Sequence, residues 1–233
     1  MTALDRVAAA FEVLLCSGFP TQILVIAMLA AAGMHPRTAR GELSGPFVFA
    51  LTLLDTLLVV ALVGFFFRAR GESVRDQLFA AARPWREVAV GLALIPASFL
   101  LIVVVLVLLQ LVAPSLRNVP HNPLADLAKT RLQAAVFALV VMIAGGVREE
   151  IQRGFVLRRF EQYLGGGAAG LIVFSALFGL GHLEQGHDVA IATGVLGAFW
   201  GVVFLMRRSV LGPMIGHAGF NLTQIAKFLL IGS

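Results

Sequence analysis

The chain has 233 residues, of which 59% are hydrophobic and only 13% are charged, and its mean hydropathy is +0.91. Soluble domains carry about 25% charged residues, so the composition excludes an ordinary soluble protein and predicts an all-α, polytopic transmembrane helical bundle. The single cysteine, Cys16, excludes an internal disulfide and a metal site made of several cysteines. The net charge of +5 does not indicate nucleic-acid binding, because the basic residues stand between apolar segments.

Apolar segments separated by polar connections predict seven membrane helices, each of which needs about 20 residues to cross a bilayer. They lie at about residues 11–32, 46–67, 88–112, 132–163, 168–182, 189–206 and 211–231. Pro20 predicts a kink in the first segment. The fourth segment continues through a charged stretch to Tyr163, and the glycines at 165–167 end it. We expect one transmembrane domain over residues 1–233, with seven or, if one span is hidden, eight membrane helices.

Lysines and arginines are unevenly distributed between the two predicted sides of the membrane. The N-terminal side carries ten of them and the opposite side five, leaving aside the charged stretch and Lys227. Basic connections are retained in the cytoplasm. The N-terminus is therefore predicted to be cytoplasmic and the C-terminus to lie outside.

Polar residues interrupt the apolar sequence in three places, although an ionisable residue at membrane depth costs about 2.5–3.5 kcal/mol. The first place is the stretch Arg148-Glu149-Glu150-Ile151-Gln152-Arg153-Gly154. The second is His182, four residues after Phe178, and the third is His217 with Asn221. Asp55, inside the second span, is expected to pair with Lys227 or an arginine.

The spacing places these polar residues near one another. Glu149 lies 17 residues before Gly166 and His182 lies 16 residues after it, so two straight antiparallel helices would bring both to one level. His217 and Asn221, four residues apart, share a helix face. Each feature alone has an ordinary structural explanation, such as an ion pair within one helix or a bond to a neighbouring helix. Together they indicate a functional site.

These residue types suit peptide-bond hydrolysis by an activated water molecule. A carboxylate, Glu149 or Glu150, would take the proton of water beside His182, while His217 and Asn221 would donate hydrogen bonds to the oxyanion. Neither G-x-S-x-G nor H-E-x-x-H occurs, which disfavours a serine nucleophile and an ordinary zinc hydrolase. We expect no cofactor, but a zinc or other divalent metal site formed by Glu149, His182 and His217 stays open as an alternative.

The order Glu-Glu…Arg, Phe-x-x-x-His and His-x-x-x-Asn, each on a hydrophobic helix, resembles the CPBP intramembrane protease family. That family includes the type II CAAX prenyl endopeptidases and bacterial relatives. The resemblance covers residues 134–229 and implies a protease-like core in a bacterial cell membrane, with a glutamic or metal-dependent mechanism. It implies that Glu149 and His182 activate water and that His217 and Asn221 stabilise the oxyanion. We count Glu150 among the expected catalytic residues, and Arg153 and Phe178 as supporting residues. The implied substrate is a peptide or protein, lipidated or not, and the oligomeric state is open.

The first motif departs from the family pattern. The family usually has three residues between the Glu pair and the Arg, whereas only Ile151 and Gln152 intervene here. Aligned on the carboxylates, Glu149 keeps the catalytic position; aligned on Arg153, Arg148 replaces the catalytic Glu. We adopt the first alignment, because the chemistry needs a carboxylate. The second predicts a catalytically inactive membrane protein of the same fold that acts in binding, immunity or as a scaffold.

Overall fold

The computed structural model describes residues 2–81, 83–120 and 122–231, and no β-strand occurs in these ranges, which confirms the all-α class. The side chain of Lys227 lies outside the described part. The α-helices are α1 (Ala3–Leu15), α2 (Phe19–Ala31), α3 (Gly45–Ala69), α4 (Val74–Leu78), α5 (Pro84–Val112), α6 (Arg131–Val141), α7 (Glu149–Tyr163), α8 (Gly167–Leu180), α9 (His187–Arg207) and α10 (Leu211–Ile231). Three 3₁₀ turns, η1 (Pro114–Leu116), η2 (Pro123–Ala128) and η4 (Leu183–Gln185), and the π-helix η3 (Met142–Arg148) complete the described elements.

The first predicted span is two helices rather than one kinked helix. The axes of α1 and α2 differ by 41°, and the break falls at residues 16–18. Gly18 there has φ +87°, a left-handed conformation that an α-helix cannot continue. Pro20 lies in the first turn of α2, where a missing N–H is tolerated. The glycine, not the proline, therefore sets the position of the break.

The fourth predicted helix is confirmed as one continuous helical run from residue 131 to residue 163, made of α6, η3 and α7. It begins with a capping box, in which the Thr130 hydroxyl accepts from the Gln133 N–H and the Gln133 side chain accepts from the Thr130 N–H. It ends before Gly165 and Gly166, which both have positive φ. The charged stretch consequently lies in the middle of a long helix.

Three described helices are long and apolar enough to cross a membrane: α3, α5 and α9. The bent pair of α1 and α2 is a fourth if it is counted as one span, and α8 is apolar but has only 14 residues. These helices agree with an integral membrane protein. The predicted number of seven or eight spans stays a prediction.

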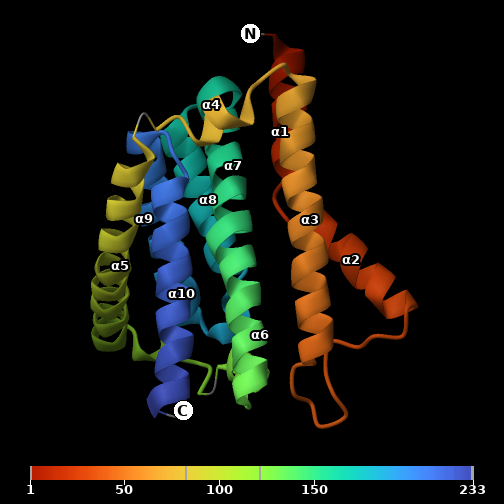
Figure 1. Ribbon diagram of the computed structural model, residues 1–233, viewed down its shortest axis with the longest axis vertical. Helices are drawn as coiled ribbons and strands as arrows, with labels where there is room; N and C mark the ends of the chain where they lie inside the picture. Colours follow the sequence, from red (N-terminus) through yellow and green to blue (C-terminus); the bar gives the residue numbers. More distant parts are fainter. Residues whose placement is uncertain (1, 82, 121, 232–233) are drawn as a thin grey trace.

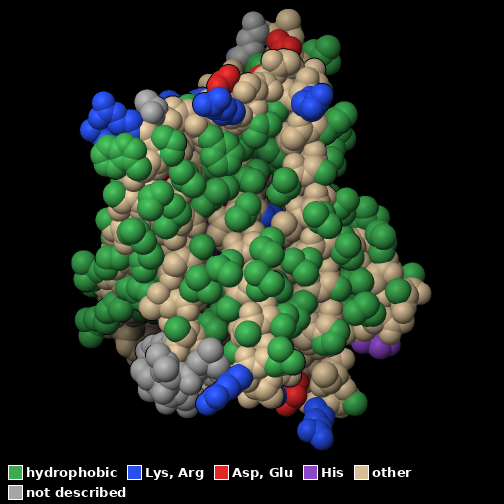
Figure 2. Space-filling model, viewed as in Figure 1, with side chains coloured by type: hydrophobic (Ala, Val, Ile, Leu, Met, Phe, Trp, Pro, Cys, Tyr) green, Lys and Arg blue, Asp and Glu red, His purple; other side chains and the backbone are tan. Residues whose placement is uncertain are grey.

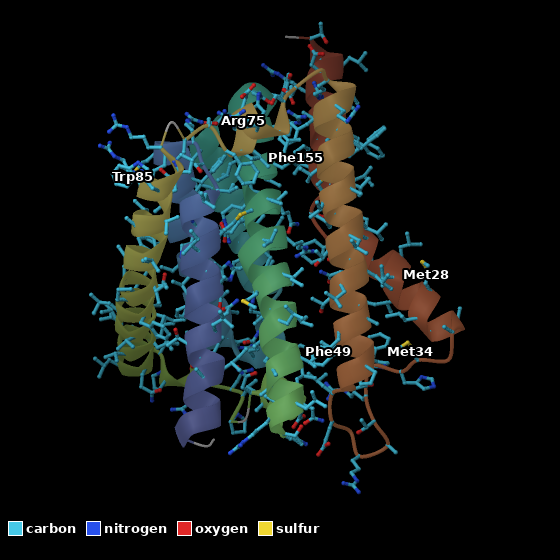
Figure 3. All side chains as sticks on the ribbon, viewed as in Figure 1. Met28, Met34, Phe49, Arg75, Trp85 and Phe155 are labelled. Carbon is cyan, nitrogen blue, oxygen red and sulfur yellow. The ribbon has the colours of Figure 1, made fainter. Side chains whose placement is uncertain are left out.

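The helices form a bundle in which α7, α8, α9 and α10 surround the centre, α5 covers α10, and α1 and α3 pack on the other side (Figure 1). The two ends of the chain lie at opposite ends of the molecule (Figure 1). Hydrophobic side chains cover the flank of the bundle, and most lysines and arginines on this face lie near its two ends (Figure 2). One core cluster joins α3 and α7 through the edge-to-face rings of Phe67 and Phe155. Figure 3 labels Phe155, which lies between these two helices. A second joins α9 and α10 through Trp200 and Phe220.

Candidate active site

A cavity of about 540 Å³ lies toward the end of the bundle opposite the N-terminus. Residues of α3, α5, α6, α7, α8, α9 and α10 and of the short elements η2, η3 and η4 line it. It is lined by five of the predicted site residues: Glu149, Phe178, His182, His217 and Asn221. Residues from three predicted polar clusters, on different helices, thus share one space, as the spacing predicts. Glu150 and Arg153 do not line it.

The two adjacent glutamates have different surroundings. The Glu149 side chain is 20% exposed, and its Oε2 lies 3.7 Å from Nε2 of His217. Glu150 is only 1% exposed, and its Oε1 lies 2.8 Å from Nδ1 of the same ring. The His217 imidazole therefore stands between two carboxylates, of which only Glu149 reaches the cavity.

Glu150 is held from behind by Arg153, one turn further along α7. The two side chains form an ion pair at (i, i+3) spacing, and Arg153 is fully buried. The guanidinium carbon lies 5.1 Å from the ring centre of Phe174, 5.0 Å from that of Phe178 and 5.5 Å from that of Trp200. This aromatic cage stabilises the buried cation through cation–π contacts and gives Phe178 its supporting position.

The orientation of His217 is fixed on three sides. Trp200 stacks on its ring with centroids 4.0 Å apart, and Phe178 meets it edge-on. With a carboxylate as acceptor, the Nδ1–H of His217 donates to Glu150. Nε2 is then the nitrogen that faces Glu149. Sequence reasoning missed Trp200, because a tryptophan in an apolar helix carries no motif that distinguishes it.

His182 lies two residues past the end of α8 and directly before η4. Its Nδ1–H donates to the carbonyl oxygen of Phe178 (2.9 Å), an assignment that follows from the acceptor. Nε2 is left with its lone pair, so it can accept a proton or a hydrogen bond from a group in the cavity.

The π-helix η3 brings α10 close to the glutamate pair. A Cβ atom on Gly145 would lie 2.6 Å from Nδ2 of Asn221 and 3.3 Å from Nε2 of His217, so any larger residue would displace the Asn221 amide. A Cβ on Gly146 would lie 2.7 Å from Cβ of Ala218. The two glycines therefore allow His217 and Asn221 to approach the backbone just before Glu149.

The same π-helix determines which residue of the first motif faces the cavity. The Glu149 N–H donates to the Ala144 carbonyl, five residues earlier, so this turn holds one more residue than an α-turn. Glu149 then faces the cavity, while Arg148 points to Asp55 on α3 and pairs with it. The carboxylate, and not the arginine, occupies the position beside His217. The ion pair of Asp55 with Arg148 confirms that Asp55, inside the second predicted span, pairs with an arginine.

No three His, Cys, Asp or Glu side chains within the described ranges are grouped so that they could hold a metal ion. Glu149, His182 and His217 share the cavity, but in this geometry they do not fit a common metal site. We therefore derive no catalytic step through a metal.

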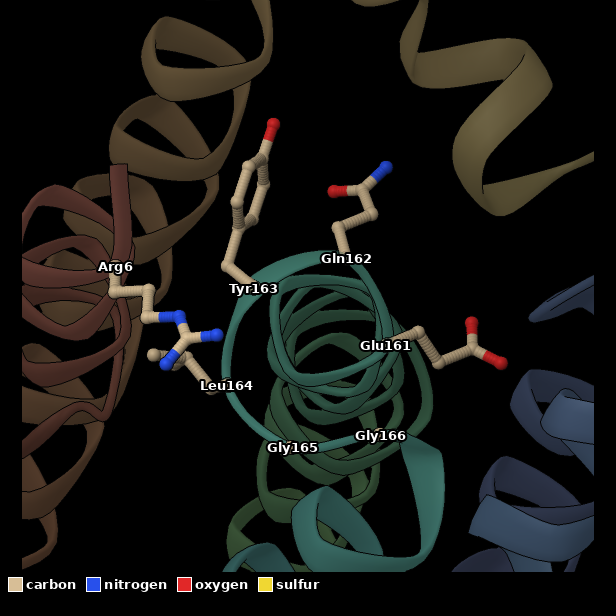
Figure 4. Close-up of a pocket in the computed structure, with 7 residues that line it drawn as sticks. All are labelled: Arg6, Glu161, Gln162, Tyr163, Leu164, Gly165 and Gly166. Atoms are coloured by element: carbon tan, nitrogen blue, oxygen red, sulfur yellow. The ribbon is translucent and has the colours of Figure 1, made fainter. Parts of the chain in front are cut away.

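A second cavity, of about 500 Å³, lies at the far end of α7 and is separate from these residues. In Figure 4, Arg6 of α1 points toward Leu164, whereas Glu161 points away to the opposite side. Glu161 is engaged by Arg158 and Arg208. This cavity contains none of the predicted site residues.

Residues 131–223 match the family model of the Rce1-like type II CAAX prenyl endopeptidases. This segment is an Rce1-like domain. It begins at the first residue of α6, ends within α10, and includes every predicted site residue from Glu149 to Asn221. No curated protein and no solved structure matches the chain. The Rce1-like domain indicates a membrane protease that acts on peptide or protein substrates, and it does not favour the non-catalytic alternative.

Proposed function

We propose that the protein is an intramembrane endopeptidase in which Glu149 activates the attacking water. The observation that carries this proposal is that the two adjacent glutamates have different surroundings. Glu149 lines the cavity together with His182, His217 and Asn221, whereas Glu150 is buried behind His217. A general base must reach the proton that it removes, and only Glu149 meets that condition.

The reaction begins with a water molecule between the Glu149 carboxylate and Nε2 of His182. Glu149 takes one proton of the water, and the oxygen attacks the carbonyl carbon of the peptide bond. The negative charge moves to the carbonyl oxygen, which accepts a hydrogen bond from Nδ2 of Asn221. The C–N bond then breaks, and Glu149 returns its proton to the leaving amine. Proton transfer of this kind contributes about 10²–10⁴-fold to a rate.

His217 is the second donor to the oxyanion in this scheme. Its Nδ1–H is engaged by Glu150, so Nε2 donates only when the ring carries both protons. Glu150 sets the orientation of the ring, and Arg153 fixes Glu150. We therefore assign Glu150 a positioning role in place of the catalytic role expected from sequence.

The cavity favours an apolar peptide segment, lipidated or not. Besides the site residues, most of its walls are hydrophobic, and they include Val48, Phe49, Phe137 and Leu196. Its lining includes residues of η2 and η4, near the end of the bundle opposite the N-terminus. With a cytoplasmic N-terminus, as the basic residues predict, substrate would reach it from the outer half of the membrane.

The test is cleavage by the purified full chain in liposomes. Two internally quenched peptides serve as probes: a farnesylated peptide with a CAAX-type C-terminus, and an unlipidated apolar peptide of the same length. We expect cleavage of at least one probe and its loss in Glu149→Gln. Glu42→Gln is the matched control, because Glu42 is a half-exposed carboxylate that pairs with Lys129 (2.7 Å) and does not line the cavity. Unchanged cleavage by Glu149→Gln would contradict the mechanism.

A further inference from the structure

Among the buried ion pairs that the proposed mechanism leaves unused, one adjoins the reacting carboxylate. Asp55 of α3 and Arg148 at the end of η3 are 3% and 8% exposed. Nη2 of Arg148 donates to Oδ2 of Asp55, and Nη1 of Arg148 lies 3.9 Å from Oε1 of Glu149. A charge-assisted N–H···O bond is about 2.7–2.9 Å long. Arg148 is therefore bonded to Asp55 and stands just outside bonding distance of Glu149.

Residues at the break between α1 and α2 pack against Asp55 and Arg148 from the other side. The Thr21 hydroxyl donates to Oδ1 of Asp55 and lies 2.9 Å from the carbonyl oxygen of Gly18. A Cβ atom on Gly18 would lie 2.5 Å from Nη2 of Arg148. Gln152 donates to the carbonyl oxygen of Cys16 (2.7 Å) and so ties the break to α7. Helices outside the Rce1-like domain thus hold both members of the pair in place.

We propose that Asp55 is a positioning residue that holds the Arg148 guanidinium away from Glu149, so that Glu149 stays directed into the cavity. This inference rests on the proposed role of Glu149. Opposite charges attract strongly in a buried site, and Nε of Arg148 has no hydrogen-bond partner among the described residues. Without Asp55, the nearest carboxylate for this arginine is Glu149. A direct Arg148–Glu149 bond would occupy the oxygen that must receive the proton of water.

Activity separates this role from a purely structural one. In Asp55→Asn we expect kcat of the folded protein to fall about 10- to 100-fold, a large part of the contribution of a general base, with KM unchanged. Asp55→Asn/Arg148→Gln removes the arginine as well, so it should recover most of the lost kcat. A pair that only joins α3 to η3 would lower the yield of folded protein and leave its kcat unchanged.

Alanine substitutions at Gly18 and at Gly33 provide a matched comparison that alters no charge. Gly18→Ala places a methyl group against the guanidinium and should lower kcat in the direction of Asp55→Asn. Gly33 has a similar backbone conformation, φ +78° against +87°, but an added Cβ there meets nothing within 4 Å. Gly33→Ala therefore reports the backbone strain alone and should keep the wild-type kcat. Equal kcat values for the two variants would overturn the proposal.

A crystal structure of Asp55→Asn tests the inference without substrate. We expect Nη1 of Arg148 to move from 3.9 Å to about 2.8 Å from Glu149. An unchanged separation overturns the proposal, whatever the enzyme cleaves. Conversely, a wild-type protein that cleaves neither peptide contradicts the proposed function, while the Arg148–Glu149 separation still decides what Asp55 does.

Discussion

Replacing Gly145 with alanine should disable the oxyanion site without unfolding the protein. Gly145 lies in η3, and an added Cβ would stand 2.6 Å from Nδ2 of Asn221, whereas ordinary contact begins at 3.4 Å. The amide must therefore retreat by roughly 0.8 Å. Nε2 of His217, at 3.3 Å, needs to move by only about a tenth of an ångström. The perturbation thus falls mainly on Asn221.

The size of the effect follows from hydrogen-bond geometry. Oxyanion donors act at about 2.7–3.1 Å, and losing one costs about 10²–10³-fold in kcat, or about 2.7–4 kcal/mol. A retreat of roughly 0.8 Å moves the amide beyond this range, so we expect kcat to fall by about 10²-fold. Stability should change little, because alanine is a better helix former than glycine by about 1 kcal/mol, which offsets part of the local strain.

The assay compares Gly145→Ala with Gly64→Ala in the liposome cleavage reaction and in thermal unfolding. Gly64 lies within α3, and a Cβ there meets nothing within 4 Å. Gly64→Ala should keep the wild-type kcat. Asn221→Ala provides the second comparison: if the alanine acts through Asn221, Gly145→Ala/Asn221→Ala should be no slower than Asn221→Ala alone. Wild-type kcat in Gly145→Ala would refute the role given to Asn221.

Three further changes test the surroundings of the site. Glu150→Gln should lower the free energy of unfolding in detergent by about 3–5 kcal/mol, because it leaves the buried Arg153 unpaired. Glu149→Gln should lower this free energy far less. Equal losses in the two variants would contradict the different burial of the two carboxylates. Glu12→Gln should lower the free energy of unfolding by about 1.5–3 kcal/mol for each of two weakened charged hydrogen bonds (2.6 Å), from Arg70 and Arg159. It should leave kcat unchanged, and a lower kcat would contradict its place outside the cavity. Cleavage should survive a metal chelator, and loss that added zinc restores would contradict a metal-free reaction.

Much of the helix order could be predicted from the sequence, because apolar segments end at glycines or polar connections. The helices α3 and α5 and the continuous run from α6 to α7 lie close to the predicted segments. The first span differs, since Pro20 marks a proline-compatible first turn while Gly18 makes the break. A positive φ is a property of the folded backbone, so the sequence could not distinguish these two positions.

The site could be predicted as a group, but not in its internal arrangement. Counting residues along antiparallel helices correctly brought Glu149 and His182 to one cavity. Which glutamate faces that cavity depends on rotation about the helix axis, and one residue turns an α-helix by about 100°. The π-turn at η3 changes this count by one residue and has no sequence signal of its own. The partnership of Asp55 with Arg148, 93 residues apart, also depends on the tertiary fold.

The short spacing between the glutamate pair and Arg153 still allows Arg153 to form an ion pair with the second glutamate. Residues three and four apart lie on the same helix face, so an arginine one residue closer still reaches the second glutamate, as the Glu150–Arg153 ion pair does. Just before the glutamate pair, the π-turn joins α7 to the preceding helix. The extra residue of the π-turn supplies a rotation at that junction, and Glu149 emerges into the cavity while Arg148 turns to α3. The carboxylate of Glu149 therefore lines the cavity in this chain and Arg148 does not, which is the arrangement that the alignment on the carboxylates predicts.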